Sequence, residues 1–263
     1  MSRISIMGIL NATPDSFFEG SRIVYQKAVD VAGKMLENGA DMLDIGGQST
    51  RPGANLVSAG EEADRVLPVI ESLVSAFPKA TISVDTFYSH VARLAVSKGA
   101  SVVNDISAGE DDEAMLSFIA ESKVTYVAMH KQGKPQNMQD NPVYQNVTAD
   151  VLGYFEKKQD LFQSMGIDNW IIDPGFGFGK TVSHNFELLG KLSKFKALGK
   201  PLLVGISRKS MIWKTLQTSA DEALNGTTAL HMAALIQGAD ILRVHDVKEA
   251  RECVNLFEAL YGK

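Results

Sequence analysis

Two aspartates, Asp85 and Asp173, each stand directly after a short run of apolar residues. A carboxylate at a strand end can accept two parallel hydrogen bonds from the N–H edge of an aminopyrimidine ring and can compensate positive charge that develops on the ring. Either aspartate alone is explained equally well as a helix cap. Asn104 and Lys209 stand at the ends of two further apolar runs and favour one shared pocket over two separate caps.

A second group of side chains is cationic. Arg51 follows the hydroxyl-bearing Thr50, and Arg243 and His245 alternate near the last apolar run. Alternate residues of a strand point to the same side, so Arg243 and His245 can face one ligand. Guanidinium and imidazole donors suit a phosphate or pyrophosphate group. For Arg243 the alternative is a salt bridge to a nearby acid such as Asp246.

The metal-binding candidates are few. Asn11 follows the first apolar run, so its amide oxygen could join a Mg²⁺ ion held mainly by ligand phosphates, or it could be only a turn residue. The five histidines have no partner at zinc-ligand spacing, which argues against a structural zinc.

The glycine-rich segment Asp173–Thr181 ends in Gly179-Lys180-Thr181, like a phosphate-binding P-loop, but Pro174 stands where that motif needs glycine. Its alternate glycines are better explained by close approach of the backbone to a flat ligand, with Phe178 placed against it. Met129 could cover one ring face or belong to the core.

Eight short runs rich in Ile, Val and Leu alternate with eight stretches of helical spacing, and these elements would position the polar side chains. The predicted strands are Ile4–Leu10, Met42–Ile45, Ile82–Val84, Val102–Ile106, Val124–Met129, Trp170–Ile172, Leu202–Ile206 and Ile241–Val244. The predicted helices are Tyr25–Asn38, Glu61–Phe77, His90–Lys98, Glu113–Glu121, Val147–Met165, Phe186–Lys196, Glu222–Ile236 and Val247–Leu260.

A strand followed by a helix, repeated eight times, predicts parallel strands with helical crossovers. Eight such units in 263 residues fit a closed (β/α)₈ TIM barrel better than a doubly wound open sheet. No linker divides the chain, so we expect a single domain over residues 1–263. The strand ends of a barrel converge on its catalytic face, where phosphate sites recur near the last strands.

Composition excludes several classes of protein. With 45% hydrophobic and 22% charged residues the chain is globular, and the net charge of -5 gives no overall attraction for nucleic acid or an anionic membrane. No apolar stretch is long enough to span a bilayer. The only cysteine, Cys253, lies in a periodic segment and is interpreted as core. The opening residues Met1–Ile4 lack the pattern of a secretion signal, so we expect a cytoplasmic protein.

Seven segments resemble, in order, the motifs of the dihydropteroate synthase family. They are Asn11–Phe17, Ser49–Gly53, Ser83–Thr86, Asn104–Ile106, Asp173–Lys180, Ser207–Lys209 and Arg243–Asp246. The resemblance covers essentially the whole chain. It implies condensation of 6-hydroxymethyl-7,8-dihydropterin pyrophosphate with p-aminobenzoate, giving 7,8-dihydropteroate and pyrophosphate in folate biosynthesis. It also implies Mg²⁺ as cofactor, a homodimer, and sulfonamides as mimics of p-aminobenzoate.

The resemblance further implies which residues form each part of the site. The pterin-binding set is Asp85, Asn104, Met129, Asp173, Phe178 and Lys209. The pyrophosphate-binding set is Thr50, Arg51, Arg243 and His245, with Asn11 on the metal. The p-aminobenzoate site would be shaped by Phe17, Thr50, Pro52, Phe178, Lys209 and Ser210. The expected catalytic residues are Asp85, Asp173, Lys209 and Arg243.

We expect an SN1-like displacement in which arginines and Mg²⁺ stabilise the departing pyrophosphate and the carboxylates stabilise the cation on the pterin methylene. Residues 11–22 and 46–58 are the long connections expected to close over the substrates and exclude water. Gln48 departs from the family, which often has Glu there, and Phe18-Glu19 replaces a frequent Ser-Asp.

Three other functions compete with this interpretation. A pterin-dependent methyltransferase would share the barrel and the carboxylates but would not need Thr50, Arg51 or a pyrophosphate site. A non-catalytic pterin-binding homologue would keep the pocket without turnover. A phosphate-binding isomerase or aldolase would need a central Lys or Glu base, for which Lys209 alone is weak support. Apolar positions in Glu222–Ile236 and Val247–Leu260 could supply a dimer interface.

Overall fold

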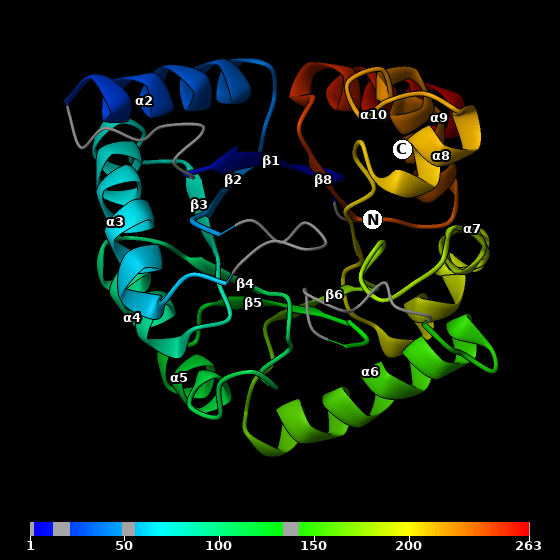
Figure 1. The fold of residues 1–263 in the computed structure, drawn as a ribbon, viewed down its shortest axis with the longest axis horizontal. Helices are drawn as coiled ribbons and strands as arrows, with labels where there is room; N and C mark the ends of the chain where they lie inside the picture. Colours follow the sequence, from blue (N-terminus) through cyan, green and yellow to red (C-terminus); the bar gives the residue numbers. More distant parts are fainter. Residues whose placement is uncertain (1–2, 13–21, 49–55, 134–141, 263) are drawn as a thin grey trace.

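The computed structural model describes residues 3–12, 22–48, 56–133 and 142–262. Its eight strands are all parallel and alternate with helices, which confirms the predicted (β/α)₈ barrel (Figure 1). The strands are β1 (Ser5–Asn11), β2 (Met42–Gly46), β3 (Thr81–Asp85), β4 (Val102–Asp105), β5 (Thr125–Met129), β6 (Trp170–Asp173), β7 (Leu203–Val204) and β8 (Ile241–Val244). The helices are α2 (Arg22–Glu37), α3 (Ala59–Ala76), α4 (Ser89–Ser97), α5 (Met115–Ser122), α6 (Val147–Ser164), α7 (Val182–Gly190), the 3₁₀ helix η1 (Leu192–Leu198), α8 (Ser210–Leu216), α9 (Leu224–Ile236) and α10 (Val247–Tyr261).

The barrel closes between β6 and β7. Strands pair in the order β6-β5-β4-β3-β2-β1-β8-β7, and a bridge between Ile172 and Leu202 joins the two ends of this order. The N–H of Ile172 donates to the carbonyl oxygen of Pro201 at 2.9 Å. Because β7 has only two residues, this seam carries less backbone pairing than the joins between the other described strands.

Side-chain alternation divides each strand between two environments. Outward residues such as Ile6, Leu43 and Val84 pack under the helices in one large core. Inward residues form a separate apolar cluster that fills the amino-terminal end of the barrel: Met7, Val102, Val127, Ile171, Leu203 and Ile241. Residues two positions further along the same strands also face inward, nearer the carboxyl ends, and they are Asn104, Met129, Asp173 and Arg243. The strand period therefore places the predicted site residues above an apolar plug.

Two predicted elements are corrected around β7. The predicted helix Phe186–Lys196 is α7 followed by η1, because the α-helix ends at Gly190 and the next turn is 3₁₀. The predicted strand Leu202–Ile206 is shorter: β7 covers only Leu203–Val204, and Leu202 makes the single bridge to Ile172. The chain turns soon after Val204, with the N–H of Lys209 donating to Ile206 O at 3.1 Å. Helix α8 was not predicted, since seven residues are too few to show a helical period.

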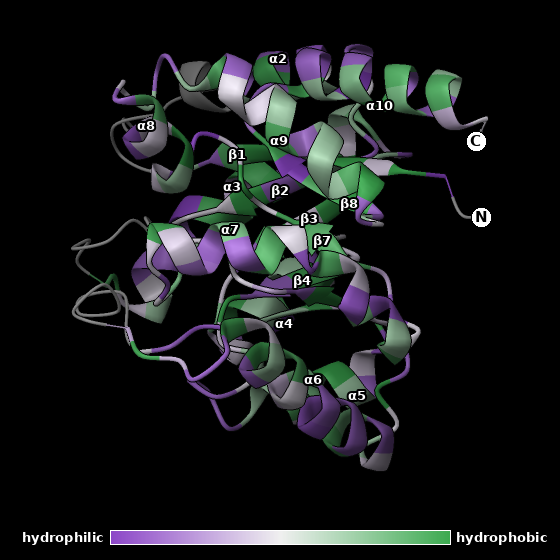
Figure 2. Ribbon diagram, turned by 90° about the vertical axis from the view of Figure 1, so that its right-hand side faces the viewer, coloured by the Kyte–Doolittle hydropathy of each residue, from purple (hydrophilic) through white to green (hydrophobic). Residues whose placement is uncertain are grey.

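The side view shows hydrophobic colouring in the central strands and mixed colouring along the surrounding helices (Figure 2). This is the pattern expected of helices that cover a sheet with one face and meet water with the other. Within the described residues, every helix is too short or too polar to cross a bilayer.

Candidate active site

The centre of the site is a buried charge network at the carboxyl ends of β2, β3 and β8. The guanidinium of Arg243 donates from Nε to Asp44 Oδ2 at 2.6 Å and from Nη2 to Asp85 Oδ2 at 2.7 Å. Arg243 is therefore held between two carboxylates on neighbouring strands. The alternative partner for Arg243 is wrong, since Asp246 pairs with Arg208 instead.

Asp44 is the residue that the sequence analysis missed. It is fully buried, and it also accepts hydrogen bonds from Ser83 Oγ at 2.6 Å and from Asn104 Nδ2 at 2.9 Å. An acid inside the apolar run Met42–Ile45 was a detectable signal, because a charged residue within a strand is almost never fully buried without partners. Asp44 fixes the orientation of both Asn104 and Arg243.

Asp173 and Lys209 form the opposite side of the site. Asp173 is buried, and its Oδ1 accepts the N–H of Gly175 at 2.8 Å. The ammonium of Lys209 donates to the carbonyl oxygen of Phe176 and lies 4.6 Å from the centroid of the Phe178 ring. The chain thus brings the ends of β6 and β7 together around one cation and one carboxylate.

Apolar side chains line this side of the site. Met129 and Phe178 pack with Phe87 and Ile106 in a small cluster separate from the main core. Met129 is 3% and Phe178 8% exposed. Both residues were predicted beside a ring, and Phe87 and Ile106 were not, because nothing in their local pattern distinguishes them from core. The lining suits a flat, partly apolar ligand.

Burial and neighbouring charges shift the pKa values of the site. Burial raises the pKa of Asp85 to about 7 although Arg243 opposes the change, and burial also raises the pKa of Asp173, opposed by Lys209. Burial lowers the pKa of Lys209 to about 8, against the pull of Asp173. For Arg243, burial acts to lower the pKa, but Asp44 and Asp85 outweigh it and raise the pKa. Of these four groups, Asp85 and Lys209 have the pKa values nearest to neutrality.

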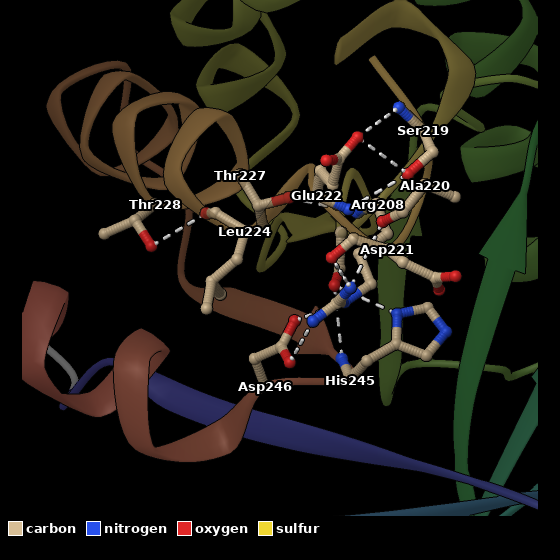
Figure 3. Close-up of polar contacts among 11 residues, drawn as sticks. Arg208, Ser219, Ala220, Asp221, Glu222, Leu224, Thr227, Thr228, His245 and Asp246 are labelled. Carbon is tan, nitrogen blue, oxygen red and sulfur yellow. Dashed lines mark hydrogen bonds and ion pairs between the residues drawn. The ribbon is translucent and has the colours of Figure 1, made fainter. Parts of the chain in front are cut away.

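Arg208 is a structural anchor beside the site (Figure 3). Its Nε and Nη2 each lie 2.8 Å from Asp246, and its Nη1 donates to the carbonyl oxygens of Ala220 at 3.1 Å and Asp221 at 2.8 Å. The residue adopts φ 55, which a non-glycine residue rarely does. Arg208 ties the segment between α8 and α9 to the start of α10.

The remaining predicted residues lie around the rim. His245 lies one residue beyond β8, exposed, with Nδ1 3.0 Å from Ser207 Oγ. Ser210 is half-buried at the first position of α8. Asn11 is exposed at the end of β1, beside Gly46.

The structure gathers Asp85, Asn104, Met129, Asp173, Phe178, Lys209 and Arg243 at one end of the barrel, as predicted. Phe17, Thr50, Arg51 and Pro52 lie outside the described residues, as do Phe18 and Glu19. Gln48 is described: it is buried, and its Oε1 accepts the N–H of Val57 at 3.2 Å. This bond joins the two ends of the connection that follows β2.

Comparison with known proteins places this geometry in a family. A family model described as "Pterin binding enzyme" matches residues 7–245. Dihydropteroate synthase of Escherichia coli K12 is 43% identical over 98% of this chain and 92% of its own. The corresponding protein of Haemophilus influenzae is 44% identical over 97% of this chain and 93% of its own.

Solved structures of dihydropteroate synthases also resemble this chain. Yersinia pestis dihydropteroate synthase with a sulfonamide drug complex superposes with a TM-score of 0.93, at 41% identity over 99% of this chain and 95% of that one. The Xanthomonas albilineans enzyme in complex with 7,8-dihydropteroate gives a TM-score of 0.88 at 37% identity, covering 99% and 95%. Carboxylates, lysine and arginine at the end of a pterin-binding barrel, with relatives this similar along nearly their whole length, place the chain in the dihydropteroate synthase family, whose members are transferases.

Proposed function

We propose that the site condenses 6-hydroxymethyl-7,8-dihydropterin pyrophosphate with p-aminobenzoate, giving 7,8-dihydropteroate, pyrophosphate and a proton. The observation that carries the proposal is the convergence of Asp85, Asp173, Lys209 and Arg243 at one end of the barrel, beside the apolar cluster that holds Met129 and Phe178. Related structures from Xanthomonas albilineans hold 4-aminobenzoic acid and 7,8-dihydropteroate, which are one substrate and the product of this reaction.

The pterin is held by the carboxylates and the apolar lining. Asp173 and Asp85 accept hydrogen bonds from the N–H groups of the ring, and Asn104, fixed by Asp44, offers an amide beside them. Met129 and Phe178 cover the ring. The carboxylates bind the ring and also stabilise positive charge that develops on it in the transition state.

The cations act on the leaving group. The bond between the methylene carbon and the pyrophosphate oxygen breaks, and its electron pair leaves with pyrophosphate. We assign the stabilisation of this negative charge to Lys209, Arg243 and His245, the basic side chains at this end of the barrel. The amine of p-aminobenzoate then bonds to the methylene carbon and loses a proton. The proposed contacts with p-aminobenzoate include Phe17, Pro52 and Ser210. Arg51 is proposed to contact pyrophosphate, and Thr50 to contact both groups.

Mg²⁺ is the proposed cofactor, with Asn11 as its protein ligand. Within the described residues there is no group of three or more His, Cys, Asp or Glu that could hold a metal ion. One amide oxygen at the exposed end of β1 fits an ion whose other ligands are pyrophosphate oxygens and water. When bound, the ion would neutralise charge on the leaving group.

The assembly and drug response are also proposals. Ile236 on α9 and Leu256 and Leu260 on α10 are 54%, 66% and 69% exposed, and the two helices pack side by side, so we propose that a second copy covers them in a homodimer. The Yersinia pestis relative binds a sulfonamide drug, which supports sulfonamides as competitors of p-aminobenzoate here. The proposed compartment is the cytoplasm, which a single buried cysteine suits.

The test is pyrophosphate release from the dihydropterin pyrophosphate with Mg²⁺, with and without p-aminobenzoate, while dihydropteroate is followed in parallel. We expect release and dihydropteroate formation to be coupled one to one. Asp173→Asn should lower turnover roughly 100-fold or more. The control is Asp168→Asn, which changes an exposed residue just before the start of β6 and should leave turnover unchanged. Tight pterin binding without condensation would point instead to a non-catalytic homologue or a methyltransferase.

A further inference from the structure

Lys180 has no part in the chemistry described so far. It belongs to the Gly179-Lys180-Thr181 sequence that imitates a P-loop, but it is 2% exposed and points into the protein. Its Nζ lies 2.9 Å from Gly175 O, 3.1 Å from Phe178 O and 3.0 Å from His130 Nδ1, with a longer contact of 3.4 Å to His130 O. Burying a lysine is costly unless its donors are satisfied, and here two carbonyl oxygens and an imidazole nitrogen lie within reach of them.

The three close partners match the three donors of an ammonium group. Two of them are carbonyl oxygens, which only accept. The third is satisfied as an acceptor only if His130 Nδ1 carries no proton, which places the imidazole proton on Nε2. With Lys180 charged, the geometry favours one protonation pattern, in which His130 is neutral and carries its proton on Nε2.

The cluster joins the segments that follow β5 and β6. The N–H of His130 donates to Asp173 O at 3.0 Å, and a Cβ on Gly175 would lie 1.8 Å from His130 O. The two backbones are thus pressed together, and Lys180 Nζ links them by contacting Gly175 and His130. The carbonyl of Phe178 is held from the same atom.

We propose that Lys180 is a positioning residue, whose ammonium holds Phe178 and the backbone after Asp173 at the spacing that the pterin ring requires. This role deepens the proposed function and rests on it. Lys180 acts through these two residues, because its three close contacts are all made inside the cluster.

The charges around the cluster set the pH range in which Lys180 can act as an ammonium. Burial lowers the pKa of Lys180 to about 7, while the carboxylate of Asp173 acts to raise it and Lys209 acts to lower it further. Burial and the neighbouring Lys180 lower the pKa of His130 to about 2, so its ring stays neutral. The rings of Tyr144 and Tyr154 pack against the same imidazole.

The first test is the tautomer of His130, read from long-range ¹H–¹⁵N spectra of the full chain at pH 6.5, with His130→Gln to assign its signals. We expect an unprotonated Nδ1 and a protonated Nε2 between pH 5.5 and 6.5, where most of Lys180 keeps its proton. In Lys180→Met, Nδ1 loses its donor, so this pattern should change. A proton on Nδ1 in the wild-type protein would overturn the proposal.

The second test is kinetic, with binding of the dihydropterin pyrophosphate measured by calorimetry alongside. Lys180→Met should lower kcat/KM for this substrate roughly tenfold to a hundredfold, since small displacements of positioning groups have effects of that size. The control for lost stability is Ile119→Ala, which truncates a buried side chain of helix α5. Both variants are assayed well below their melting temperatures. Ile119→Ala should leave kcat/KM unchanged.

A Lys180→Met variant within threefold of the wild-type protein in kcat/KM and in pterin affinity would overturn the positioning role. If the wild-type protein makes no dihydropteroate, the proposed function fails, and the His130 spectra together with the pterin affinities of the two proteins still decide what Lys180 does.

Discussion

Asp44 offers the sharpest test of how the site is built, because it holds two site residues from beneath. Its Oδ2 accepts from both Arg243 Nε and Asn104 Nδ2, and its Oδ1 accepts from Ser83 Oγ. Replacing Asp44 by Asn keeps the size of the side chain. The amide can satisfy all three partners only by turning its oxygen toward Arg243 and Asn104, with the hydroxyl of Ser83 accepting from the new NH₂.

The cost of Asp44→Asn follows from this geometry. A hydrogen bond to a charged group contributes about 1.5–3 kcal/mol and a neutral one about 0.5–1.5 kcal/mol. Two such bonds to Oδ2 become weaker, so we expect the free energy of unfolding to fall by roughly 2–3 kcal/mol, or about 4–12 °C in melting temperature for a chain of this length. If the displaced Arg243 stabilises the transition state by about 1.4–2.8 kcal/mol less than in the wild-type protein, kcat/KM falls roughly 10- to 100-fold.

Thermal unfolding and steady-state kinetics with the dihydropterin pyrophosphate measure the two effects. Ser83→Ala is the matched control: it removes one hydrogen bond to Asp44 and leaves the carboxylate, so it should cost about 1 kcal/mol and change kcat/KM less than threefold. An Asp44→Asn variant with kcat/KM within twofold of the wild-type protein would refute the idea that Asp44 orients Arg243 and Asn104.

Two further predictions follow from the site and its supporting loop. Activity should rise with pH through about 7 as Asp85 loses its proton, and fall as Lys180 and Lys209 lose theirs, through about 7 and about 8. Lys209→Arg should remove only the limb near pH 8, because arginine stays charged, and a limb near pH 8 that persists in this variant would exclude Lys209 as its source. Gly175→Ala should destabilise by roughly 3 kcal/mol or more, since φ is +72 and the new Cβ would meet His130 O at 1.8 Å. A Cβ on Gly153 in α6 would meet no side chain and no backbone from outside its own helix within 4 Å, so Gly153→Ala should instead stabilise by about 0.5–1 kcal/mol. Similar melting temperatures for the two variants would contradict this prediction.

Much of the barrel is predictable from local patterns. Apolar runs alternate with helical spacing, and several helices end at a glycine with positive φ, such as Gly99 and Gly238. Two elements that were predicted wrongly or not at all are short ones. Helix α8 is too short to show a period, and β7 has only two residues, with a turn soon after it.

The site is predictable in its members but not in its pairings. The strand period places Asn104, Asp173 and Arg243 on the inner face, so their convergence could be expected. Their partners come from distant parts of the chain: Arg243 and Asp44 are 199 residues apart. No local spacing distinguishes Asp44 from Asp246 as the partner of Arg243, because that choice depends on which strands are neighbours in the closed barrel. That the whole chain acts as one domain stays a prediction.

The seam between β6 and β7 links ligand binding to barrel closure. Asp173 is the last residue of β6, and Lys209 follows β7. A pterin bound by both residues would therefore connect the two strands where the barrel has the least backbone pairing. Binding and closure then strengthen each other by the same free energy, as thermodynamic linkage requires. We expect the backbone amides of Ile172 and Val204 to exchange with deuterium faster than those of β1 and β2 in the free protein, and to become the best reporters of an occupied site.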